Sequence, residues 1–83
     1  MRPEDIRELN RRQPFQPYRI YITGGKTYEI YHPDQLLVLR SRLVIGVGGD
    51  NNIPDGTEHI SLIHIVRIEE LSEDSKAYET PSR

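Results

Sequence analysis

The stretch YRIYITGGKTYEIYHP, residues 18–33, decides the fold of this chain. Two runs rich in β-branched and aromatic residues flank a pair of glycines, which is the pattern of a β-hairpin. A three-residue loop at 23–25 sets Ile20 opposite Tyr28, whereas a loop with an even number of residues would set the isoleucines opposite polar residues. The apolar pattern therefore predicts the three-residue loop, with Gly25 in the positive-φ conformation that closes such loops.

A short helix is predicted before the hairpin, at residues 3–12 (PEDIRELNRR). Proline is tolerated in the first helical position, and acidic and basic residues stand at the ends that the helix dipole favours. Its two apolar residues, Ile6 and Leu9, lie three positions apart on one side. Such a helix is marginal alone and must pack on the rest of the domain. Phe15, which lies between two prolines, is expected to anchor beneath it.

Further strands are predicted after the hairpin. The predicted strands span about 18–23, 26–31, 35–40, 43–47 and 58–69. The last one carries apolar residues on both faces: Ile60, Leu62, Val66 and Ile68 share one phase, and Ile63 and Ile65 the other. A break near Ile63 and His64 is therefore expected. The segment 48–57 is rich in turn-forming residues and predicts a mobile surface loop, and residues 72–83 are expected to be a disordered tail.

These elements predict one domain, residues 1–71, of mainly β class. A short N-terminal α-helix precedes a bent antiparallel meander of about five strands. In so short a chain, closing the sheet into a small SH3-like or Sm-like barrel would remove its free edges, with the helix capping one end. An open sheet with the helix on one face is the competing architecture.

The amino-acid composition limits the classes of protein and the cellular compartments to be expected. The 83-residue chain has no cysteine, which excludes a disulfide framework and thiolate metal sites and favours the cytoplasm. Its charged start and interrupted apolar runs predict neither a signal peptide nor a membrane span. The net charge is −2, but residues 1–42 carry +3 and residues 43–83 carry −5. This polarity is typical of two ordinary solvated faces, and head-to-tail self-association or contact with an anionic partner is the alternative reading.

No motif in the sequence specifies a reaction. VIGVGGD, residues 44–50, lacks the helix or the Gly-Lys-Ser/Thr that phosphate-binding loops need. His32, His59 and His64 lack metal-type spacing, and no serine stands in a nucleophile elbow. We therefore expect no enzyme, no cofactor and no metal site.

Nucleic acid is a more serious candidate. Arginines that could form a basic rim are Arg7, Arg11, Arg12, Arg19, Arg40 and Arg42. Aromatic rings can stack on unpaired bases at about 1 to 3 kcal/mol each. Of the hairpin tyrosines, however, only Tyr21 and Tyr31 are expected to face outward, and such a pair is more typical of sheet packing.

The segment RRQPFQPYRIYITGG, residues 11–25, resembles the opening of Sm-like proteins, in particular the bacterial RNA chaperone Hfq. DQLLVL (34–39) is similar to that family's third strand, and HIVRI (64–68) to its last strands. The resemblance implies a helix on a bent five-stranded barrel, ring assembly and a uridine pocket. In that pocket Asp34 and Gln35 match the family, but Leu36 replaces its aromatic residue and Ile63 replaces the lysine before His64.

The chain is also similar to short uncharacterised bacterial proteins with a Pro-Phe-x-Pro-aromatic-Arg-Ile motif, here residues 14–20. That resemblance implies no function.

Together these observations predict a non-catalytic interaction module that associates with itself, or with an unknown protein partner, through an edge strand. The residues expected at the self-association surface are Ile60, Leu62, Ile63, Ile65 and Ile68. The alternative is an Sm-like ring that binds single-stranded RNA. Its candidate RNA contacts are Arg11, Arg12, Gln35 and His64. RNA is the less favoured partner, and no membrane contact is expected.

Overall fold

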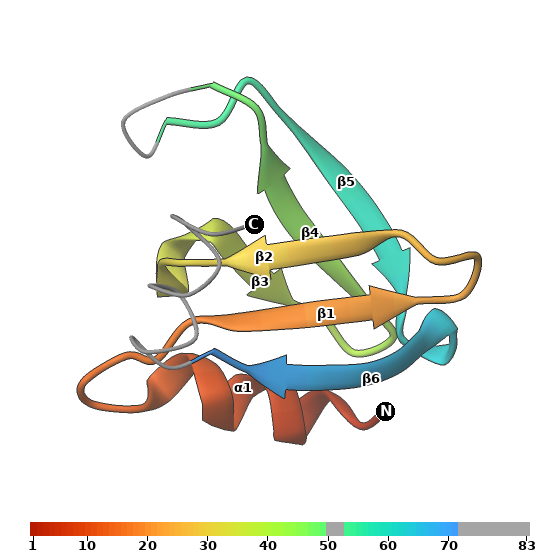
Figure 1. Ribbon diagram of the computed structural model, residues 1–83, viewed down its shortest axis with the longest axis horizontal. Helices are drawn as coiled ribbons and strands as arrows, with labels where there is room; N and C mark the ends of the chain where they lie inside the picture. Colours follow the sequence, from red (N-terminus) through yellow and green to blue (C-terminus); the bar gives the residue numbers. More distant parts are fainter. Residues whose placement is uncertain (50–52, 72–83) are drawn as a thin grey trace, which may run out of the picture.

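The computed structural model describes residues 1–49 and 53–71 (Figure 1). The chain begins with the helix α1 (Pro3–Arg11). The remaining elements are β1 (Tyr18–Ile22), β2 (Thr27–Ile30), the 3₁₀ turn η1 (Pro33–Gln35), β3 (Leu36–Val38), β4 (Arg42–Val47), β5 (Gly56–Ser61), the 3₁₀ turn η2 (Leu62–His64) and β6 (Ile65–Glu70). The prediction of a mainly β domain behind one N-terminal helix is confirmed.

The six strands form two antiparallel sheets of three strands each, which cross one another in Figure 1. One sheet has the order β2-β1-β6 and the other β3-β4-β5. The strands do not form the one continuous meander that was predicted, because β2 and β3 belong to different sheets and the last strand pairs with the first. Within the described residues no ladder joins the two sheets. The predicted closure into one barrel is therefore not confirmed.

The hairpin of residues 18–33 has the predicted register. Ile20 lies opposite Tyr28, and the N–H of Ile22 donates to the Lys26 carbonyl at 3.0 Å. The loop between these last two residues is the predicted three-residue loop. Gly24 and Gly25 both have a φ of 95°, a conformation that glycine adopts without steric cost.

The helix packs against the sheets as its apolar stripe predicts. Ile6 is fully buried in the core, and Leu9 and Phe15 pack against it while remaining partly exposed. The core side chains, drawn from both sheets, are Ile6, Tyr18, Ile20, Tyr28, Ile30, Leu36, Leu43, Ile45, Ile60, Leu62 and Ile65. Each sheet thus buries one face against the other, and α1 closes the lower side in Figure 1.

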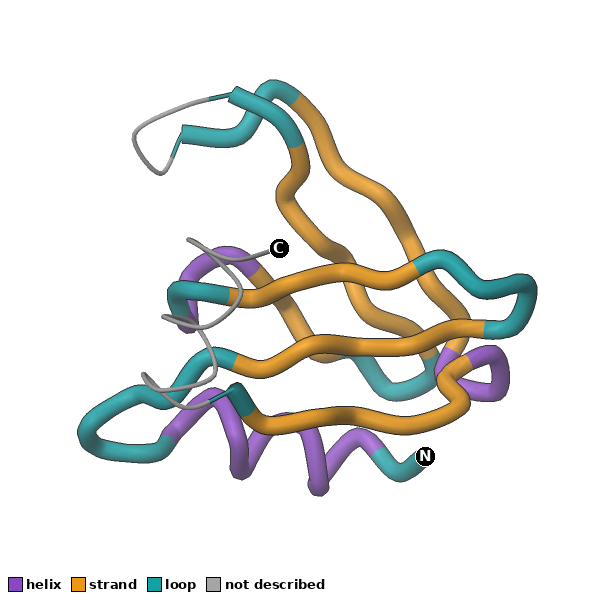
Figure 2. Tube along the Cα trace, in the orientation of Figure 1, coloured by secondary structure: helices purple, strands orange, loops and turns teal. Residues whose placement is uncertain are grey.

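The predicted break in the last strand is confirmed at η2, which separates β5 from β6 (Figure 2). After this break, the residues that share a face of the strand differ from those predicted. Tyr21 pairs with Arg67 but Ile22 pairs with Ile65, so Val66 is an extra residue in a bulge. Ile65 is therefore buried with Ile60 and Leu62, whereas Val66 is exposed and does not share their face as predicted.

Most element bounds lie within two or three residues of those predicted. The third strand is shorter than expected because η1 takes up Gln35 at its start and a turn closed by the Leu39 N–H and the Arg42 carbonyl follows Val38. In the predicted loop of residues 48–57, Gly56 and Thr57 belong to β5. Residues 50–52 of that loop and the predicted disordered tail, 72–83, lie outside the described residues.

Candidate functional site

Each of the two sheets has two edge strands, and side chains at the C-terminal end of α1, or just after it, contact one edge strand of each. The side-chain amide of Asn10 donates to the carbonyl of Leu36 in β3 at 3.4 Å. On the other sheet, the Arg12 guanidinium forms an ion pair of 2.8 Å with Glu70 of β6. The helix therefore lies across the side of the molecule on which β3 and β6 end their sheets (Figure 1).

The end of the β2 edge next to η1 is capped by the side chain of Gln35. Its amide oxygen accepts from the N–H of Tyr31 at 3.0 Å, and its amide nitrogen donates to the carbonyl of Glu29 at 3.0 Å. These two backbone groups flank Ile30 and point away from β1. The amide thus occupies the place that a neighbouring strand would take, which is one way of blocking an edge.

The edge of β5 has no such cover in the described parts of the chain. The N–H of Leu62 donates to the Ser41 carbonyl, and Leu43 lies opposite Ile60 two residues further along β4. Hydrogen-bonded and non-bonded pairs alternate in an antiparallel ladder. The residues of β5 whose backbone groups point away from β4 are therefore Thr57, His59 and Ser61.

These three residues present six backbone groups, since each has one N–H and one carbonyl. None of the six bonds to another described residue. Sequence reasoning expected an edge strand within residues 58–69 but did not single out these three residues, because it searched for apolar side chains. The available signal was the alternation within GTEHIS, where Ile60 is buried between the exposed His59 and the half-buried Ser61.

A polar clasp holds the inner face of β5 to β2. The Tyr28 hydroxyl donates to the Glu58 carboxylate, which also pairs with the Lys26 ammonium at 3.2 Å. The hydrogen bond from Tyr28, followed by that from Lys26, lowers the pKa of Glu58. Burial first and the bond to Glu58 second raise the pKa of Tyr28. The clasp joins the two sheets through side chains alone.

A pocket of about 620 Å³ opens between β2 and the β4–β5 hairpin. Its floor includes Ile45 and Gly46, and Pro54 packs so closely on Gly46 that an added Cβ would lie 2.9 Å from Pro54 Cγ. Its polar lining residues come from β2, from η1 and from the link between them, and include His32 and Asp34. None of the described histidine and carboxylate side chains gathers into a metal-binding group of three.

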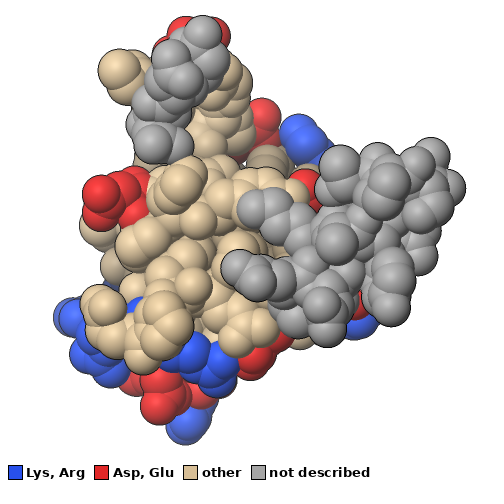
Figure 3. Space-filling view, turned by 60° about the vertical axis from the view of Figure 1, so that its left-hand side comes forward, with Lys and Arg blue, Asp and Glu red and all other residues tan. Residues whose placement is uncertain are grey.

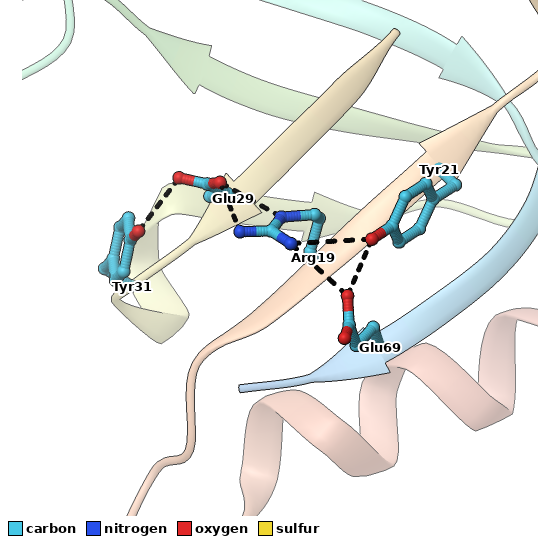
Figure 4. Close-up of polar contacts among 5 residues, drawn as sticks. All are labelled: Arg19, Tyr21, Glu29, Tyr31 and Glu69. Atoms are coloured by element: carbon cyan, nitrogen blue, oxygen red, sulfur yellow. Dashed lines mark hydrogen bonds and ion pairs between the residues drawn. The ribbon is translucent and has the colours of Figure 1, made fainter. Parts of the chain in front are cut away.

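The outer face of the β2-β1-β6 sheet carries a network of charged and phenolic groups (Figure 4). Arg19 contacts Glu29 at 2.8 Å and Glu69 at 3.3 Å. The Tyr21 hydroxyl donates to Glu69 at 2.6 Å and is the main cause of that carboxyl's lowered pKa. The Tyr31 hydroxyl donates to Glu29. Two tyrosines predicted to face outward thus orient acidic groups around a largely covered arginine.

Of the four predicted RNA contacts, three lie at one end of the molecule and His64 lies at the other. Arg11 and Arg12 stand at the C-terminal end of α1, and Gln35 is engaged by the backbone of β2. His64 belongs to η2, at the opposite end of the molecule from η1 (Figure 2). Figure 3 shows that basic side chains along the lower border of the face in view are interspersed with acidic ones.

The predicted self-association residues fall into two groups. Ile60, Leu62 and Ile65 are buried in this chain's own core, and Ile68 is partly buried against it. Ile63, at the tip of η2, is 83 % exposed. Only Ile63 of the five is thus a large exposed side chain, and it lies next to the end of β5.

Among the described residues there is no helix with the length and apolar character needed to cross a membrane. Comparison of the chain with models of known protein families, with curated proteins and with solved structures finds no match.

Proposed function

We propose that this protein is a non-catalytic interaction module that associates with further copies of itself through the outer edge of β5. The observation that carries the proposal is the set of backbone groups on Thr57, His59 and Ser61 that bond to no other described residue. An uncovered edge of this kind is a template for pairing with another strand. Among the other edges, Asn10 of α1 bonds to the backbone of β3, and Gln35 bonds to two backbone groups at the end of β2.

Exposed apolar side chains at both ends of β5 support the same proposal. Ile63 follows the strand and is 83 % exposed, and Ile53 precedes it and is 72 % exposed. Large apolar side chains that flank an open edge gain free energy when a second chain covers them. An unrelated protein that adds a strand at this edge is the other partner class that the prediction named.

The predicted alternative is an Sm-like ring that binds single-stranded RNA. This alternative also includes the prediction that the fold is an SH3-like or Sm-like barrel. The helix packed on two crossed sheets is compatible with that resemblance. The four RNA residues, however, lie at two ends of the molecule, and Arg12 is neutralised by Glu70. We therefore keep RNA binding as a prediction and favour contacts between protein strands.

The test of the proposal compares His59→Pro with His59→Ala. Proline removes one outward N–H from the middle of the edge without removing a bond to β4, a position where folded sheets accept proline. Alanine removes the same side chain but keeps the N–H. Molar mass is measured by light scattering during size-exclusion chromatography, from about 10 µM to about 1 mM protein.

We expect the wild type and His59→Ala to rise in mass with concentration, and His59→Pro to remain monomeric with its circular dichroism retained. Equal masses for the three proteins would contradict pairing through this edge. A wild type that stays monomeric throughout would contradict self-association and direct the search to a different protein partner.

A further inference from the structure

The backbone groups of β5 that point away from β4 are arranged symmetrically about one residue, and this limits the ways in which two copies of β5 can pair. The inference drawn here rests on the proposed function. Thr57, His59 and Ser61 are evenly spaced, with His59 in the middle. When a strand pairs with an antiparallel copy of itself, the two strands are related by a two-fold axis. The axis then passes beside one residue, which lies opposite its own copy.

We infer that two copies of this chain pair β5 to β5, antiparallel, with His59 of one copy opposite His59 of the other. In this register Thr57 lies opposite Ser61 of the second copy. All six outward backbone groups of each β5 then find partners. A slip by two residues in either direction leaves groups of both copies unpaired, so the central register makes the most hydrogen bonds.

The side chains on the exposed face fit this arrangement. Leu37, Val44 and His59 lie in one cross-strand row on the face turned away from the core. Leu37 is 59 % exposed. Pairing at β5 extends the row across both copies and converts two three-stranded sheets into one six-stranded sheet. Thr57 and Ser61 bring hydroxyl groups together, a pair that stabilises neighbouring strands.

The antiparallel arrangement also explains why the apolar side chains stand at both ends of β5. In the antiparallel pair, the end of one β5 lies beside the start of the other β5. Ile63 of the first copy, which follows its strand, therefore lies at the same end as Ile53 of the second copy, which precedes its strand. These two residues are far apart within one copy. Across the two-fold axis they lie at the same end of the paired strands, and the contact occurs twice.

The polar clasp on the inner face of β5 does not prevent its outer edge from pairing with a second strand. Glu58 and Ile60 point toward the core side, where Glu58 is held by Tyr28 and Lys26. The groups that pair with the second copy belong to the alternate residues. No side-chain interaction between the residues that the structure describes has to be broken before β5 pairs.

The test places charges at the residue that would lie on the axis. His59→Lys and His59→Glu each set like charges directly opposite one another, and we expect each to weaken the dimer about fivefold. An equimolar mixture sets Lys opposite Glu, and it should recover at least the wild-type dimer fraction. Sedimentation equilibrium of each variant and of the mixture measures the three dissociation constants.

The matched control is Thr57→Lys, which adds the same charge to the same edge but lies opposite Ser61 of the second copy. We expect its dissociation constant to stay within about twofold of the wild type. Thermal unfolding of all variants at low concentration checks the fold, because both substituted side chains are exposed.

Recovery in the mixture supports the two-fold register. Dimerisation that is insensitive to both His59 charges, or equally sensitive to Thr57→Lys, overturns the register and leaves self-association standing. An assembly of more than two copies overturns the two-fold arrangement as well. A wild-type monomer at every concentration overturns the proposed function together with this inference.

Discussion

The hydroxyl of Tyr18 donates a hydrogen bond of 2.6 Å to the side-chain oxygen of Asn10. Tyr18 is fully buried in β1, and Asn10 lies in the last turn of α1. The amide nitrogen of Asn10 donates in turn to the carbonyls of Pro33 and Leu36. One side chain therefore ties the helix to both sheets.

Replacing Tyr18 with phenylalanine should lower the free energy of unfolding by about 1 to 2 kcal/mol, because the Asn10 oxygen loses its partner in a partly buried site. Asn10→Ala should cost at least as much, since it also gives up the bonds to the two carbonyls. Urea unfolding of both single variants and the double variant measures the coupling. Additive losses would show that this hydrogen bond does not link helix and sheet.

Alkaline pH should destabilise the protein through the same tyrosine. Burial raises the pKa of Tyr18 in the folded chain, whereas an unfolded tyrosine titrates near pH 10. Above about pH 10 the unfolded state loses this proton first, so the free energy of unfolding falls as pH rises. Lys26 and Tyr28, whose pKa values are also raised, contribute in the same direction.

Tyr18→Phe isolates the contribution of Tyr18 from those two groups. Between about pH 8 and about pH 11 the variant should lose less stability than the wild type in urea unfolding. Equal losses in the two proteins would assign the alkaline instability to other residues.

Tyr21→Phe should raise the pKa of Glu69 toward its ordinary value, because the Tyr21 hydroxyl bond is the main cause of its depression. A carboxyl-carbon NMR titration measures this pKa directly. Tyr31→Phe is the matched control, since that hydroxyl bonds to Glu29 instead. In the wild type the stability due to Glu69 is present above about pH 4.3 and is lost as pH falls. The loss should be smaller in Tyr21→Phe.

Gly46→Ala should destabilise the fold by about 1 kcal/mol or more through overpacking. Its Cβ would lie 2.9 Å from Pro54 Cγ and 3.1 Å from Pro54 Cβ. Gly56→Ala, on the neighbouring strand, meets no atom within 4 Å and should leave the melting temperature unchanged or slightly raised. A melting temperature for Gly46→Ala equal to that of Gly56→Ala would contradict the close contact with Pro54.

Local patterns in the sequence were sufficient to predict the hairpin, the helix and the break at η2. Alternation distinguished the two hairpin registers because each would place Ile20 opposite a different residue, and the structure has the predicted one. Local patterns could not predict which residues of β6 face the core. This depends on the bulge at Val66, which arises from pairing with β1, more than forty residues earlier in the chain.

The candidate site was predicted only in outline. An edge strand within residues 58–69 was expected, but which edge is free depends on where α1 and Gln35 lie after folding. Apolar residues such as Ile60 and Ile65 suggested a surface, and the structure uses them for the core. The unpaired groups belong to the backbone of polar residues, so hydrophobic patterning gave no sign of them.

Amide hydrogen exchange followed by NMR tests the central claim most directly. At low concentration the amides of Glu58 and Ile60, which bond to β4, should be protected, and those of Thr57, His59 and Ser61 should exchange freely. At high concentration the account predicts that these three amides become protected together as the molar mass rises. A rise in mass that leaves them unprotected would contradict pairing through β5.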